Sequence, residues 1–137
     1  MIGGYAYNLY RNPRATGDID FFVSIDSENE ARMRQALNDF GFGSSVPPQS
    51  QPLLVDGKVI MLGRSPIRID ILTKIDGVTF TEVEATSQRF KLGDLSVPVI
   101  SPQMLLKNKL STGRAEDNAD AVELTRWLSE LNGRSEA

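Results

Sequence analysis

The first clear element along the chain is a strand over residues 18–25, where β-branched and aromatic residues cluster. After it, apolar residues recur at helical spacing as far as Phe40, so a helix follows the strand. Ser27 and Glu30 have the spacing of a capping box at the start of that helix. Gly41 is suited to end it, because glycine readily takes the left-handed conformation that follows many helices.

The middle of the chain predicts two strands joined by a tight turn. The strands are expected over residues 58–62 and 67–75, and Gly63–Pro66 supplies the turn residues of a hairpin. Residues 80–89 are ambiguous and fit a short helix. Residues 95–100 predict another strand, and the proline inside it favours a position at a sheet edge.

Two helices are predicted at the C-terminal end. Ser101 and the proline after it indicate the N-cap and first residue of a helix that runs to about Ser111, and Gly113 breaks it. The last helix is expected over residues 115–131, followed by a frayed tail. Its expected buried face consists of Ala119, Val122, Leu124, Trp127, Leu128 and Leu131. This order of elements predicts one α+β (α/β-like) domain over residues 1–137, with a mixed β-sheet packed by helices.

Composition narrows the chemistry. The 137 residues include neither cysteine nor histidine. Thiol catalysis, Cys- or His-ligated metals and Ser-His-Asp triads are therefore excluded, and catalysis must use carboxylates, Lys, Arg, hydroxyls or a hard cation. The net charge of −3 argues against non-specific DNA binding. The sequence has neither a secretory signal nor an apolar run of about 18 residues, so we expect a cytoplasmic protein without a membrane partner.

Three acidic residues form the strongest chemical signal. Asp18 and Asp20 stand two apart in a predicted strand and therefore share one face. Asp70 interrupts an otherwise apolar strand. If the two strands are neighbours, three carboxylates converge, and such a set can hold two divalent ions for phosphoryl transfer. The structural alternative is that Asp70 forms an ion pair with Arg68 or Arg14.

A glycine pair precedes these acids. Gly3 and Gly4 are followed by helix-compatible residues 5–10, an arrangement that resembles a phosphate-cradling turn. Backbone N–H groups at a helix N-terminus attract anions, and the missing Cβ atoms allow close approach. The alternative is a plain turn.

The combination of Gly3–Gly4, Asp18-Ile19-Asp20 and the isolated Asp70 resembles the DNA polymerase β-like nucleotidyltransferase superfamily. The likeness is closest to small bacterial members related to abortive-infection toxins. Segments similar to that group lie at 3–10, 13–20 and 99–109, and at Gly113-Arg114 and Asp117 to Asp120.

The resemblance implies a nucleotidyltransferase core that uses Mg²⁺ or Mn²⁺ to move a nucleoside monophosphate from an NTP and release pyrophosphate. It implies that Asp18 and Asp20 bind the metal, and that Asp70 is a third ligand or a base. Lys109 would contact the triphosphate or brace the site. Arg114, Asp117 and Asp120 would be structural or lie on the acceptor side; for Arg114 and Asp117 a helix-surface pair is the plainer interpretation. The implied nucleotide-binding residues are Gly3, Gly4, Arg14, Thr16 and Lys109.

The resemblance leaves the acceptor open: family members modify tRNA ends, proteins or small molecules at a hydroxyl or phosphate. A toxin paired with an antitoxin protein is one specialisation. In the family a helix and a full strand precede the glycine pair, whereas here only Met1 and Ile2 do, so either the true chain starts earlier or this is a trimmed version. A missing strand would expose a sheet edge, which either is covered by a homodimer or leaves the protein without catalytic activity. The alternative function is a non-catalytic domain on the same scaffold that binds a nucleotide or a protein.

Overall fold

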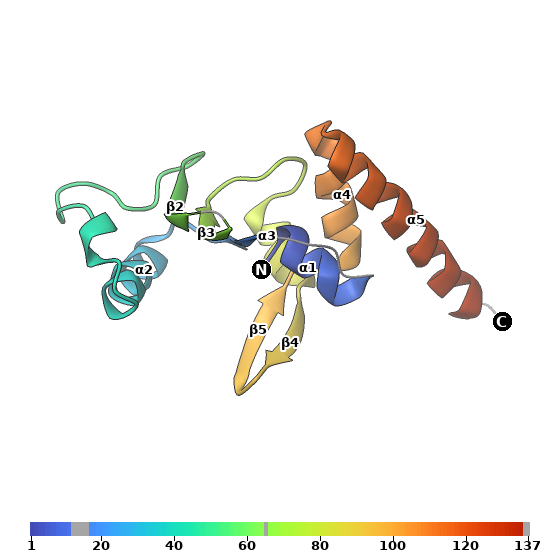
Figure 1. Ribbon diagram of the computed structural model, residues 1–137, viewed down its shortest axis with the longest axis horizontal. Coiled ribbons are helices and arrows are strands. Elements are labelled where there is room, and N and C mark those ends of the chain that lie inside the picture. The colour runs from blue at the N-terminus through green and yellow to red at the C-terminus, as the bar shows by residue number, and fades with distance from the viewer. Residues whose placement is uncertain (12–16, 65, 136–137) are drawn as a thin grey trace.

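The computed structural model describes residues 1–11, 17–64 and 66–135 (Figure 1). Its first sheet contains β1 (Asp18–Phe22), β2 (Val59–Arg64) and β3 (Ile67–Leu72) in the order β1-β3-β2. β1 runs parallel to β3, and β2 runs antiparallel to it. The remaining elements are α1 (Gly3–Tyr10), α2 (Ser27–Asp39), η1 (Gly43–Ser45), α3 (Phe80–Thr86), β4 (Gln88–Leu92), β5 (Leu95–Val99), α4 (Pro102–Thr112) and α5 (Ala115–Ser135). The prediction of an α+β fold with a small mixed sheet and a helical C-terminal end is confirmed.

The predicted strand at 18–25 is too long, because local side-chain hydrogen bonds end β1 early. Ser24 donates its hydroxyl to Asp26 at 2.6 Å, and Asp26 then caps α2 by accepting the backbone N–H of Asn29 at 2.9 Å. The expected Ser27/Glu30 capping box is therefore wrong. The Glu30 carboxylate instead accepts backbone N–H groups from the loop at Leu53 and Leu54.

The predicted hairpin is confirmed, with shifted boundaries. Gly63 stays in β2 opposite Arg68, at a φ of +84°, and a Cβ there would lie 2.8 Å from the carbonyl oxygen of Ile67. β3 ends at Leu72 rather than residue 75, because the hydroxyl of the following Thr73 donates to the loop carbonyl of Val55. The turn thus starts later, and the second strand stops sooner, than the sequence pattern indicates.

The segment at 80–89 holds a helix and a strand. α3 begins with a capping box, in which Thr79 and Glu82 bond each other's backbone N–H groups. The strand β4, which the sequence pattern did not predict, pairs with β5 to form a hairpin that projects from the rest of the chain (Figure 1). Because β5 belongs to this two-stranded sheet, Pro98 lies in an edge strand as expected.

The buried side chains form two hydrophobic clusters. The first surrounds α1, α4 and α5, where Ala6, Ile100, Leu105 and Leu124 are almost fully buried. The second lies between the sheet and α2 and consists of Leu37, Leu53, Leu54, Leu62 and Ile71.

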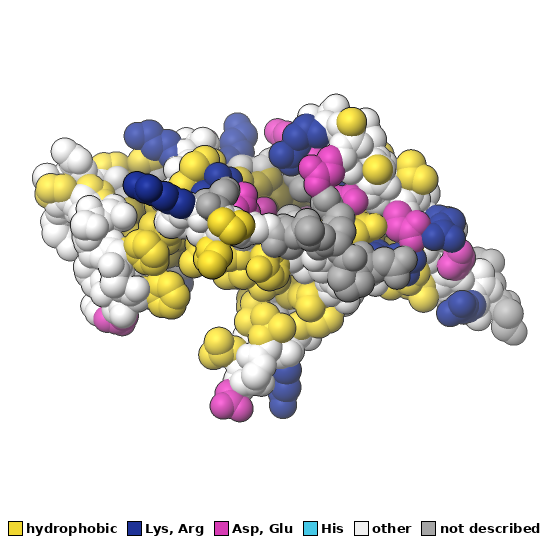
Figure 2. Space-filling view, in the orientation of Figure 1, with side chains coloured by type: hydrophobic (Ala, Val, Ile, Leu, Met, Phe, Trp, Pro, Cys, Tyr) yellow, Lys and Arg dark blue, Asp and Glu magenta, His cyan; other side chains and the backbone are white. Residues whose placement is uncertain are grey.

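Between α2 and the β4–β5 hairpin the hydrophobic surface stays open. A groove of about 570 Å³ runs there, and Ile19, Phe21, Met33, Phe40 and Pro98 are among its apolar lining residues. Figure 2 shows hydrophobic side chains gathered in this part of the surface.

The expected buried face of α5 is partly wrong. Leu124 is buried, but Ala119, Val122 and Leu131 are exposed. The inward positions of the first turns are instead occupied by Ala121 and by two acidic residues, Asp117 and Asp120. The buried face of α5 is rotated from its expected position because a buried lysine of α4 draws the two carboxylates inward, as described below. The helix also continues to Ser135, beyond its predicted end.

Met1 and Ile2 connect the two sheets through backbone hydrogen bonds. Ile2 donates its N–H to the carbonyl of Asp20, while Ile100 donates to the carbonyl of Met1, each at 3.0 Å. The N-terminal ammonium of Met1 donates to Pro98 at 2.9 Å. These contacts hold the start of α1 against the middle of β1. In the described part of the chain, no helix is long and apolar enough to cross a membrane.

Candidate functional site

The register of β1 and β3 brings the three predicted acids together. Asp20 lies opposite Asp70, and Asp18 lies opposite Arg68. Since strand side chains alternate with a period of two, these four side chains share one face of the sheet. The expectation that the two strands are neighbours, so that the carboxylates converge, is confirmed.

Arg68 connects two of these acids. Its Nε lies 2.8 Å from Oδ1 of Asp70, and its Nη2 lies 2.9 Å from Oδ2 of the same carboxylate. The same Nη2 is 2.9 Å from Oδ2 of Asp18. This two-point geometry is the strong form of an arginine–carboxylate pair. The ion pair between Asp70 and Arg68, the structural alternative raised by the sequence, is therefore present alongside the converging carboxylates.

The surroundings of Asp20 oppose its ionisation. Partial burial, followed by the negative charges of Asp70 and Asp18 and a hydrogen bond with Asp70, raises the pKa of Asp20 to about 6. The positive charge of Arg68 acts in the opposite direction and is outweighed. Among the described residues, the acids of this cluster therefore carry more negative charge than Arg68 offsets.

Gly3 occupies the expected position at the start of α1, but the structure gives a steric reason for a glycine there. Its φ is +68°, and a Cβ at this position would collide with the Asp20 carboxylate. The missing side chain thus makes room for an acid of the site. Gly4 lies on the wall of a small cavity of about 200 Å³ beside Asp18 and Asp20.

The acids line an open cleft of about 540 Å³ between the sheet and α4. Asp18, Asp20 and Asp70 form one side with Arg68. The other residues that line it include Lys74, Asp76, Asn108, Thr112 and Arg114. The side chain of Arg114 is 74% exposed. Two cationic side chains, Lys74 and Arg114, thus lie in the same cleft as the acids.

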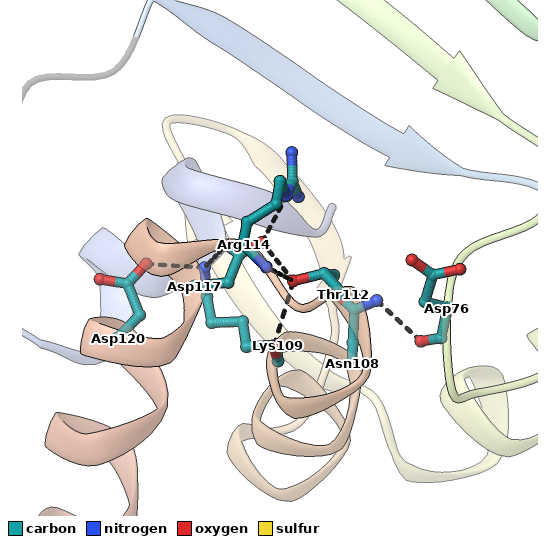
Figure 3. Close-up of polar contacts among 7 residues, drawn as sticks. All are labelled: Asp76, Asn108, Lys109, Thr112, Arg114, Asp117 and Asp120. Carbon is teal, nitrogen blue, oxygen red and sulfur yellow. Dashed lines mark hydrogen bonds and ion pairs between the residues drawn. The ribbon is translucent and has the colours of Figure 1, made fainter.

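Lys109 lies beside this cleft and is almost fully buried. Its Nζ is 2.7 Å from Asp120 and 3.2 Å from Asp117 (Figure 3). The same atom lies 5.6 Å from the ring centre of Tyr7. This geometry favours the bracing role over direct contact with a triphosphate, since both acids that hold the ammonium come from α5.

Asp117 joins Lys109 to the cleft wall. It accepts hydrogen bonds from Thr112 at 2.7 Å and from Nε of Arg114 at 2.6 Å (Figure 3). Although burial acts against it, the hydrogen bonds from Thr112 and Lys109, together with the charges of Lys109 and Arg114, hold the pKa of Asp117 below its ordinary value. The pairing of Arg114 with Asp117 is confirmed.

The sequence matches no protein-family model and no curated protein. The assignment of the site therefore depends on its own chemistry.

Two of the predicted nucleotide-binding residues, Arg14 and Thr16, lie outside the described residues. Conversely, the sequence pattern did not single out Lys74, Asn108 or Thr112, because they reach the cleft only through the packing of α4 and the loop after β3. Asn108 shows this packing directly, since its side-chain amide donates to the carbonyl of Asp76 at 2.8 Å (Figure 3).

The carboxylates supply the oxygen donors that hard divalent cations prefer. As the side chains lie, the described residues contain no group of three acids disposed to hold a metal ion. The oxygens of Asp18 and Asp70 instead face the guanidinium of Arg68. A divalent ion at these acids therefore competes with Arg68, whose side chain is 29% exposed.

Proposed function

We propose that the chain is a metal-dependent nucleotidyltransferase that moves a nucleoside monophosphate from an NTP to a hydroxyl or phosphate acceptor and releases pyrophosphate. The observation that carries this proposal is the β1–β3 register, which sets Asp20 opposite Asp70 and adds Asp18 on the same face of a cleft. Three acids on one wall, with cationic Lys74 and Arg114 in the same cleft, suit a metal-bound polyphosphate better than a neutral ligand.

The donor set fits a hard cation. Asp18, Asp20 and Asp70 would hold Mg²⁺ or Mn²⁺. The raised pKa of Asp20 reflects its burial and then the negative charges of Asp70 and Asp18, and a cation would favour its ionised form. When bound, the ion neutralises the triphosphate and lowers the pKa of the acceptor hydroxyl.

The chain's own residues have separate tasks in the transfer. Lys74 and Arg114 bind and orient the phosphates, and the Asp70 carboxylate accepts the proton of the acceptor hydroxyl. The acceptor oxygen forms a bond to the α-phosphorus, and the bond from that phosphorus to the pyrophosphate oxygen breaks. Pyrophosphate leaves with the electron pair. Lys109 acts indirectly, because it keeps α4 and α5 together behind the cleft.

A second candidate is a non-catalytic domain that binds a nucleotide or a protein. The ion pairs of Arg68 favour it, since they already satisfy Asp18 and Asp70 without any metal. The two candidates differ in what they require of Asp70: a binding domain tolerates Asp70→Asn, whereas the transfer reaction does not.

The proposal is tested by pyrophosphate release from each of the four NTPs, with Mg²⁺ or with EDTA. The acceptors offered are tRNA, the chain itself and hydroxyl-bearing small molecules such as aminoglycosides. We expect metal-dependent release with one acceptor class and its loss in Asp70→Asn. Asp76→Asn, which changes another acid that lines the cleft, serves as the control and should retain release. Metal-dependent NTP binding without release, unchanged in Asp70→Asn, would favour the non-catalytic domain and contradict the enzyme.

A further inference from the structure

Arg68 occupies the position where the proposed function requires a metal ion. Its guanidinium touches Oδ2 of Asp18 and both carboxylate oxygens of Asp70, at 2.8–2.9 Å. These are oxygens that a divalent ion held by the same acids would need. The guanidinium uses lone pairs of these oxygens and repels a second cation at contact distance, so binding of the ion and the Arg68 ion pairs compete with each other.

The surroundings of Arg68 allow it to leave. Its side chain is 29% exposed and lies on the wall of an open cleft, so the guanidinium reaches solvent by rotating about its own side-chain bonds. The Asp70 carboxylate, by contrast, is only 11% exposed and would lose most of its compensation. A carboxylate buried to this degree is costly without a partner, so departure of the arginine requires a replacement cation.

We propose that Arg68 is a built-in counter-cation, a positioning residue that holds Asp18 and Asp70 in the metal-free protein and is displaced when a divalent ion binds. This inference rests on the proposed function, since it assumes that the three acids are the metal site. It adds that metal affinity is lowered by competition with Arg68, so the site loads only when the ion outcompetes the guanidinium.

Arg64 provides a matched control for charge. It lies in β2 opposite Ile67, and it is exposed. Ile67 is adjacent to Arg68 in β3, so the side chain of Arg64 lies on the other face of the sheet. Arg64→Gln therefore removes the same charge from the same hairpin without touching the acids.

The experiment is calorimetric titration of Mn²⁺ into wild type, Arg68→Gln, Arg68→Lys and Arg64→Gln, each with and without Asp20→Asn. We expect Arg68→Gln to bind Mn²⁺ at least about tenfold more tightly than wild type, because competition is removed. The Mn²⁺ affinity of Arg68→Lys should lie between those of wild type and Arg68→Gln, since lysine keeps the positive charge but lacks the two-point geometry of the guanidinium. Arg64→Gln should stay within about twofold of wild type, because its charge is exposed and screened.

If Arg68→Gln binds Mn²⁺ as tightly as wild type or more weakly, the inference about Arg68 is overturned. If Asp20→Asn abolishes Mn²⁺ binding in the same experiment, the proposed function is still supported. Binding that Asp20→Asn does not affect, or no binding in any variant, overturns both.

A second measurement uses the wild type and does not depend on whether Arg68→Gln folds. The Nε–H signal of Arg68 in a ¹⁵N correlation spectrum should shift, and exchange faster with water, as Mg²⁺ saturates the site. An unchanged Nε–H signal at saturation contradicts displacement.

Discussion

Gly3 lies against the carboxylate of Asp20 so closely that any β-carbon at position 3 would overlap Oδ2 of that acid. The backbone N–H of Ile2, one residue earlier, donates to the Asp20 carbonyl. The start of α1 therefore packs directly against Asp20, the central acid of the cleft. A substitution at either position affects the other.

Gly3→Ala should destabilise the protein by about 2 kcal/mol or more, because it adds steric overlap to the cost of a left-handed alanine. Gly93→Ala separates the two effects. Gly93 has a similar φ of +64° with nothing near its missing Cβ, so its variant should lose only about 1 kcal/mol. Urea unfolding measures both. Equal losses would show that Asp20 does not crowd position 3.

Asp20→Asn should stabilise the metal-free protein at neutral pH. The pKa of Asp20 is about 6 in the folded chain, above its ordinary value of 3.8, so ionised Asp20 disfavours the folded state. This penalty is absent below about pH 4 and complete above pH 6, so wild type should lose stability relative to the variant as pH rises through that window. Thermal melts at pH 4 and pH 7.5 in EDTA measure the difference. A constant difference at both values would contradict the raised pKa.

Lys109→Met should cost about 3–5 kcal/mol, because it removes the ammonium that lies 2.7 Å from Asp120 and 3.2 Å from Asp117, two buried carboxylates. Lys107→Met is the control on the same helix. Its side chain is 51% exposed and its ammonium pairs with Glu82 at 3.3 Å, so its removal should change stability little. Chemical unfolding of both variants gives the comparison. Similar losses of stability in the two variants would mean that the ion pairs of Lys109 do not hold α4 to α5.

The rotated face of α5 has its own test. Leu124→Ala should cost about 2–5 kcal/mol, since Leu124 is fully buried, whereas Val122→Ala at a 71% exposed position should cost less than about 0.5 kcal/mol. The sequence pattern alone predicts comparable losses. Denaturant titration of the two variants distinguishes the two faces.

The local signals in the sequence were sufficient where a residue acts through its own neighbours in the chain. Ser101 and Pro102 start α4, and Gly113 ends it in a left-handed conformation, as their positions indicate. The alternation around Asp18 and Asp20 also places both acids on one face.

Tertiary contacts decided the rest. The buried face of α5 depends on Lys109, a residue of another helix, so its periodicity could not be read from α5 alone. Glu30 has capping-box spacing, yet it binds the backbone of a distant loop. The two alternatives for Asp70 turned out to be compatible, because Arg68 and the other two acids share one face of the β1–β3 pair.

The measurement that tests the central claim most directly is calorimetric titration of NTPs, with Mg²⁺ and with EDTA, into wild type and the Asp18→Asn/Asp20→Asn double variant. The account predicts that at least one NTP binds only with Mg²⁺, and that the double variant loses this binding while keeping the wild-type fold by circular dichroism. Binding that is indifferent to Mg²⁺ or survives in the double variant, or no binding under either condition, would contradict a metal-dependent nucleotide site at these acids.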